Sequence, residues 1–222
     1  MFKFDKLVFG DLGWGDELLF ATLMTITVSI LSMGLGLCLA IITVWAKLIT
    51  NRITRLIANF YTTVVRGIPE LLVIYLIFFG GNSVVMGVAK LFGYNGYIEL
   101  NALTIGTIAI AFISATYSSE VIRAAYLAVN KGQVEAAKAL GLNKIQIFLR
   151  VMGPQIIRHA LPGIGNVWQI TLKDTSLISV TGLVEIMRQT RIASNVEHSP
   201  LTFLITAAVS YTHLTLPTKR IV

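Results

Sequence analysis

The segment that decides the fold is residues 18–46, LLFATLMTITVSILSMGLGLCLAIITVWA, which contains no charged side chain. An α-helix needs about 20 consecutive apolar residues to cross the hydrocarbon core of a bilayer. The apolar part of a signal peptide is shorter, about 7–15 residues, and follows basic residues, whereas Asp16 and Glu17 precede this segment. We therefore expect residues 18–46 to remain in the mature chain as a transmembrane helix.

The rest of the composition also indicates a membrane protein. Charged residues make up 13% of the chain, against about 25% in a soluble domain, and the mean hydropathy is +0.76. Further apolar stretches follow the first, without charge at 71–89 and 100–119 and with interruptions at 159–184 and 201–209. The pattern predicts an all-α, polytopic membrane protein with about five transmembrane helices, forming a single domain over residues 1–222.

The last stretch is atypical. Residues 201–209 are too short to span a bilayer, and residues 210–222, SYTHLTLPTKRIV, show no helical periodicity. Two interpretations stay open: a truncated or misread end, or a fifth helix that Thr and His complete and Pro217 ends.

Charge differences between alternate loops predict the orientation, because short basic loops stay in the cytoplasm. Residues 1–17 hold two basic and four acidic side chains, and residues 47–55 hold three basic side chains and no acid. Residues 123–158 hold six basic side chains against Glu135 alone. We predict an external N-terminus, with the loops near residues 50 and 140 in the cytoplasm.

Several function classes are disfavoured. The net charge of +7 is spread between apolar segments and is not gathered on one face, so nucleic acid is not an expected partner. Cys38 is the one cysteine, and the histidines lack the spacing of metal ligands, so no metal site is expected. Motifs of intramembrane or serine hydrolases are absent, so no catalytic residue is expected. The chain also lacks a Walker-type Gly-Lys-Ser or Gly-Lys-Thr loop, so it is expected to bind no cofactor of its own.

The cytoplasmic segment 123–158 is long for a connection between spans. Its composition predicts a short helix from Lys131 that stops at Gly141 in a left-handed conformation. Asn143 is suited to begin a second helix, which Gly153 and Pro154 are expected to end. This projection could be a docking surface for a partner, or an amphipathic elbow that rests among lipid headgroups.

The motif Glu135-Ala136-Ala137, followed by Gly141 and Pro154, resembles the signature loop of permease subunits of ATP-binding-cassette (ABC) importers. The similarity is greatest to the polar amino acid branch, which includes histidine, arginine, glutamine and opine importers. Supporting segments are RGIPELL at 66–72, ALPGIGN at 160–166 and LKDTSL at 172–177, and the similarity covers about residues 15–205. One departure is Gly153, where the family usually has Leu.

The resemblance implies a type I ABC importer permease in a bacterial inner membrane. Its expected partners are a cytoplasmic ATPase dimer that uses ATP, a second identical or related permease, a solute-binding protein outside the cell, and membrane lipid. The implied ATPase-coupling residues are Glu135, Ala136, Ala137, Ala139, Leu140 and Gly141. The competing hypothesis is an ion-coupled secondary transporter or channel subunit, which would not need a cytoplasmic helix pair.

Charged residues at membrane depth are candidates for the translocation path. The clearest group is Lys173, Asp174, Thr175 and Ser176. Because the two charges are adjacent, they cannot share one helix face, so we expect a break in the helix or separate partners. The alternative is structural: Lys173 extends its amine to the interface and Asp174 caps the following segment.

Other polar residues have packing or docking interpretations. Arg66 and Glu70 stand one turn apart and are expected to pair, with Pro69 opening a span after an amphipathic approach over residues 51–66. Small and hydroxyl side chains in the first span predict close helix contacts: Thr22, Thr25, Thr27, Gly34 and Gly36. The external loop with Glu185, Arg188 and Arg191 either faces the binding protein or is simply solvated.

Overall fold

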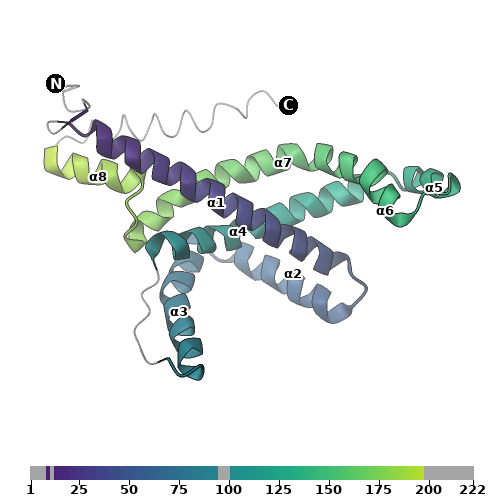
Figure 1. Cartoon of the computed structure of the whole chain (residues 1–222), viewed down its shortest axis with the longest axis horizontal. Coiled ribbons are helices and arrows are strands. Elements are labelled where there is room, and N and C mark those ends of the chain that lie inside the picture. Colours follow the sequence, from purple (N-terminus) through teal and green to yellow (C-terminus); the bar gives the residue numbers. More distant parts are fainter. Residues whose placement is uncertain (1–8, 11–12, 95–100, 198–222) are drawn as a thin grey trace.

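The computed structural model describes residues 9–10, 13–94 and 101–197, and the described residues form helices without strands (Figure 1). The helices are α1 (Gly15–Leu48), α2 (Arg52–Gly67), α3 (Glu70–Leu91), α4 (Ala102–Ala128), α5 (Lys131–Ala139), α6 (Lys144–Ile147), α7 (Gly153–Asp174) and α8 (Ile186–Glu197). A π-helical turn, Phe148–Met152, joins α6 to α7, and a 3₁₀ turn, Thr175–Thr181, follows α7. The all-α prediction is confirmed.

Helix α4 is the centre of the fold, because α1, α2, α3 and α7 all pack against it. One apolar cluster joins Val28 of α1 to Ile110 of α4 and Ile178 of the 3₁₀ turn. A second joins Ile74 of α3 to Ile113 of α4. In Figure 1, α3 runs away from the other long helices, and only a small part of it is buried.

Three helices, α1, α3 and α4, are long and apolar enough to cross a membrane. They contain the first two predicted spans and nearly all of the third. Helix α7 and the 3₁₀ turn cover most of the interrupted stretch 159–184, with a more polar sequence. The predicted last span at 201–209 and the atypical segment 210–222 lie outside the described residues.

The approach of the chain to α3 follows the prediction in outline. Asn51 caps α2, Ile68 is extended before Pro69, and α3 begins at Glu70. A residue before proline is disfavoured in the helical conformation, which explains the interruption. The predicted pairing of Arg66 with Glu70 is wrong, because no continuous helix carries both.

The expected end of the second helix at Gly153 and Pro154 is also wrong. Gly153 has helical backbone angles, and the chain passes from α6 through the π-helical turn directly into α7. Pro154 stands in the first turn of α7, where its missing N–H and fixed φ are tolerated. The result is one rod from Lys144 to Thr181 in which the helix type changes three times, from α to π, back to α, and then to 3₁₀.

A close contact joins α1 to α4. A Cβ atom at Gly36 would overlap the Ser114 hydroxyl and lie 3.1 Å from the Ala111 carbonyl oxygen. The Ser32 hydroxyl donates to the Thr107 carbonyl at 3.1 Å, so the two helices are also hydrogen-bonded. Thr25 is buried, whereas Thr27 is exposed and Gly34 has open space around it. The predicted close contact is therefore confirmed at Gly36 and Thr25, and not at Gly34 or Thr27.

Replacing Gly36 with Leu is expected to destabilise the purified protein in detergent by roughly 1–3 kcal/mol, because the side chain must push α1 away from α4. Gly34→Leu is the matched control on the same helix and is expected to change the melting temperature little. Equal melting temperatures for the two variants would contradict the close contact.

Candidate functional site

Helix α5 begins and ends with well-formed caps. The Asn130 side chain accepts a hydrogen bond from the Gly132 N–H at 2.8 Å. At the other end, the Leu142 N–H donates to the Ala137 carbonyl at 3.1 Å and the Gly141 N–H donates to the Lys138 carbonyl at 2.9 Å. These two bonds form a Schellman motif, which needs a left-handed residue. Gly141 supplies it with φ of 76°, so the predicted left-handed stop is confirmed.

The residues implied in ATPase coupling do not share one environment. Five are exposed: Glu135, Ala136, Ala139, Leu140 and Gly141. Ala137 is only 4% exposed and packs inward, against the rest of the chain. The Gln155 side chain of α7 donates a hydrogen bond to Gln133, which ties α5 to the start of α7. Helix α5 is therefore fixed on its inner side and open on its outer side.

An exposed apolar surface, here named the apolar tip, lies at the α5–α6 end of the molecule. Its residues are Leu140, Ile145, Phe148 and Leu149, which are between 51% and 82% exposed. The segment is well ordered by a capping box between Asn143 and Gln146, whose two hydrogen bonds measure 2.9 and 3.0 Å. Figure 1 shows that α5 and α6 form one end of the molecule, beyond the ends of α4 and α7. Exposed apolar side chains on a rigid projection are typical of a surface that another protein covers.

A second group of residues, here named the polar cluster, lies where α7, α3 and α4 meet. Asp174 ends α7, is 6% exposed, and lies near the Glu70 carboxyl at the start of α3. The Tyr117 hydroxyl of α4 donates to Glu70 at 3.1 Å. The Arg66 guanidinium lies over the Tyr117 ring, 5.5 Å from its centroid. Two neighbouring carboxyl groups are suited to bind a cationic group that lies between them.

The predicted translocation residues separate in the structure. Lys173 is exposed and Asp174 is buried, so the two adjacent charges face different surroundings, and the helix changes to a 3₁₀ turn between Asp174 and Thr175. The Thr175 and Ser176 hydroxyls each donate to a carbonyl three residues earlier, at 2.7 Å. Asp174 makes no side-chain capping hydrogen bond to the 3₁₀ turn, so the capping alternative is wrong. Of the four residues, Asp174 is the one that joins the polar cluster.

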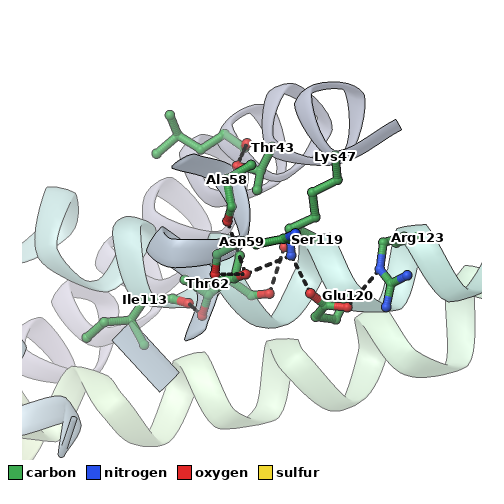
Figure 2. A network of polar contacts seen from close by, with 11 residues as sticks. Thr43, Lys47, Ala58, Asn59, Thr62, Ile113, Ser119, Glu120 and Arg123 are labelled. Atoms are coloured by element: carbon green, nitrogen blue, oxygen red, sulfur yellow. Dashed lines mark hydrogen bonds and ion pairs between the residues drawn. The ribbon is translucent and has the colours of Figure 1, made fainter. Parts of the chain in front are cut away.

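A third feature is an ion-pair network that no sequence motif predicted (Figure 2). The Lys47 ammonium of α1 donates to the Thr62 hydroxyl of α2 at 2.7 Å and forms an ion pair with Glu120 of α4. The Arg123 Nε atom binds the other Glu120 oxygen at 3.0 Å. The Lys47 side chain is 4% exposed, so its charge depends on these partners. The sequence does contain a signal for this network, because Lys47 and Glu120 are the first charged residues after the uncharged runs 18–46 and 100–119.

The connection to α8 forms a basic cleft at the opposite end of the molecule from the apolar tip. The buried Glu185 carboxylate accepts the Met187 and Arg188 N–H groups at 2.9 and 2.8 Å, at the start of α8. Burial raises the pKa of Glu185, and these N–H groups and Arg191 oppose that rise. A cleft of about 500 Å³ lies next to it, with Arg188, Arg191 and Asn195 among its lining residues.

Residues 32–222 match the family described as binding-protein-dependent transport system inner membrane component. The chain belongs to this family. It is therefore the inner membrane, permease component of a transport system, and this kind of subunit is not itself catalytic. Family membership implies partner ATPase and binding-protein subunits.

Similar proteins agree with this assignment. The permease is 49% identical to the nopaline transport system permease protein of Agrobacterium fabrum, over 96% of this chain and 91% of the relative. It is 38% identical to the histidine/lysine/arginine/ornithine transport system permease protein of Escherichia coli, over 90% and 87% of the two chains. A crystal structure of an amino acid ABC transporter with histidines has the same fold, with a TM-score of 0.76, 28% identity and coverage of 94% and 95%.

Proposed function

We propose that this permease moves an amino acid or an opine into the bacterial cell by alternating access, driven by a separate ATPase dimer. The observation that carries the proposal is the apolar tip, a rigid and exposed projection at one end of the helical bundle. The relatives support the substrate class, since their names refer to nopaline and to basic amino acids. An ion-coupled transporter is not favoured, because it has no need for such a docking projection.

The tip is suited to pass motion from an ATPase to the membrane. The exposed side of α5 carries Ala136 and Ala139, and Leu140 projects directly after its end, so a groove in the partner can approach the helix backbone closely and hold the leucine. From the tip, the rod formed by α6, the π-helical turn and α7 continues to Asp174. Movement of the ATPase subunits would then displace Asp174 relative to Glu70 and Tyr117.

We infer the orientation of the chain from the same surface. If the tip meets a cytoplasmic ATPase, the start of α1 lies outside, because Figure 1 places the first turns of α1 and the α5 projection at opposite ends of the molecule. This agrees with the basic loops near residues 50 and 140. The basic cleft beside α8 is then external, where a solute-binding protein would deliver substrate. A second permease, identical or related, completes the proposed importer.

The polar cluster is the proposed place where the substrate crosses the membrane. Neighbouring carboxyl groups favour an ammonium or guanidinium group, which can bind oxygens of both. Such a group is present in arginine, histidine as its cation, and the arginine-derived opines. Asp174 and Glu70 are the proposed contacts, and Tyr117 positions Glu70.

Leu140→Asp is expected to reduce ATP-driven uptake in reconstituted vesicles to background, because a charged side chain cannot enter an apolar groove of the ATPase. Insertion into the membrane should be unchanged, since Leu140 is 82% exposed. Leu127→Asp, at an exposed position near the end of α4, is the matched control. Wild-type uptake by the Leu140→Asp complex would rule out docking through the tip.

Asp174→Asn is expected to lower the uptake of cationic substrates by tenfold or more, about the effect of losing 1.4 kcal/mol of interaction. Labelled arginine, histidine, octopine and nopaline are the probes, with glutamine as the neutral comparison. Lys173→Gln alters the neighbouring, exposed charge and should affect uptake much less. If both variants transport arginine equally well, Asp174 does not contact the substrate.

Replacing both Arg188 and Arg191 with Glu is expected to abolish stimulation of ATPase activity by the solute-binding protein, because the basic cleft becomes acidic. Basal ATPase activity should remain. Arg55→Glu, on the proposed cytoplasmic side, serves as the control for added negative charge. Unchanged stimulation in the double variant would place the docking surface elsewhere.

A further inference from the structure

The Lys47–Glu120 ion pair marks the depth of one membrane boundary. Residues 100–119 of the chain carry no charge, and 20 helical residues extend about 30 Å, the thickness of the hydrocarbon core. Glu120 is the first charged residue beyond that run, and Lys47 is the first beyond the uncharged run of α1. Because these two residues pair, both helices leave the hydrocarbon core at the same level. In the proposed orientation this is the cytoplasmic boundary.

A cleft of about 440 Å³ lies at this level between α2 and α4. Helix α2 lines it with Thr62, Thr63, Arg66 and Gly67, and helix α4 lines it with Tyr117 and Glu120. It is separate from the tip and from the basic cleft beside α8. The cleft borders the polar cluster through Arg66 and Tyr117.

The charges around the cleft favour an anion. Both oxygens of Glu120 are already bound, one by Lys47 and one by Arg123. Arg66, on the opposite wall, forms no ion pair in the part of the chain that the structure describes. The Arg66 side chain is exposed and stacks on Tyr117, and its N–H groups donate no hydrogen bond to another side chain in the described part of the chain. A guanidinium in this state is suited to bind an oxyanion through two parallel hydrogen bonds.

The surroundings of the cleft also favour a lipid over a small soluble anion. Helix α2 is amphipathic, and its exposed apolar side chains are Ile53, Leu56, Ile57 and Phe60. These residues offer a surface for acyl chains on the helix that carries Arg66. An amphipathic helix at a membrane boundary, with basic residues on its polar side, is typical of contact with anionic headgroups.

We propose that the cleft between α2 and α4 binds the phosphate of an anionic phospholipid, with Arg66 as the principal ligand. Lys47 and Arg123 neutralise Glu120, so the acid does not repel the phosphate. The Thr63 hydroxyl, on the same wall, is available to the headgroup. A bound lipid at this position fills the space between α2 and α4 and holds the α2–α3 interruption in place next to the polar cluster.

The test uses the purified permease assembled with its ATPase, stripped of lipid in detergent and titrated with dioleoyl phosphatidylglycerol or dioleoyl phosphatidylcholine. Native mass spectrometry measures lipid occupancy. The wild-type complex is expected to bind phosphatidylglycerol about fivefold more tightly, the effect of roughly one basic residue at an anionic surface. Arg66→Met should remove this preference, and Arg66→Lys should keep part of it because the charge remains. Arg55→Met, on the same helix and outside the cleft, is the control and should keep the full preference.

The outcomes separate the alternatives. A wild-type complex without preference, or a preference that Arg66→Met retains, overturns the proposal. Equal loss in the Arg55→Met control would indicate a diffuse basic surface and no site. Displacement of the lipid by millimolar inorganic phosphate would indicate a site for soluble oxyanions, and displacement by arginine or octopine would indicate a substrate site. Lipid occupancy does not depend on uptake, so failure here leaves the proposed transport function untouched.

Discussion

The buried Lys47 ammonium is the constraint on which the packing of this permease depends. Removing a charge from water costs several kcal/mol unless an opposite charge and hydrogen bonds replace the solvent. Glu120 and Thr62 supply these partners from two other helices, so α1, α2 and α4 must meet at one level. The close contact at Gly36 fixes the same pair, α1 and α4, about three turns away along α1. Together they leave little freedom for α1 to slide along α4.

The packing of α1 against α4 contrasts with the rod from α6 to the 3₁₀ turn, which contains two segments that are not α-helical. A π-helical turn and a 3₁₀ turn have poorer hydrogen-bond geometry than an α-helix and often lie at functional sites. The π-helical turn lies beside the apolar tip, and the 3₁₀ turn begins directly after Asp174. The rod therefore departs from regular α-helix at the end where motion would enter and at the end where it would act on the polar cluster.

Sequence patterns predicted the parts of this structure that depend on local chemistry. Run length located α1, α3 and α4, and turn chemistry located the Asn143 cap and the left-handed Gly141. The failures came from tertiary context: Pro154 continues a helix because it stands in a first turn, and Ile68 interrupts the helix that would pair Arg66 with Glu70. Nothing in the sequence distinguished Tyr117, which lies within an uncharged run. The Lys47–Glu120 contact joins residues 73 positions apart. Contacts of this kind can be predicted only when the three-dimensional arrangement of the helices is known.

Two environments of opposite charge lie along one face of helix α4. Tyr117, Glu120 and Arg123 follow one another at a spacing of three residues, so they lie on neighbouring turns of the same side. Tyr117 contacts the acidic pair of the polar cluster, whereas Glu120 is surrounded by cations. A cationic group that leaves the acidic pair in the direction of Glu120 therefore meets a region of excess positive charge. This positive charge is an electrostatic barrier to the movement of a cationic substrate. An anion bound between Arg66 and Glu120 would lower the barrier, so the occupant of the cleft would affect how readily the substrate moves.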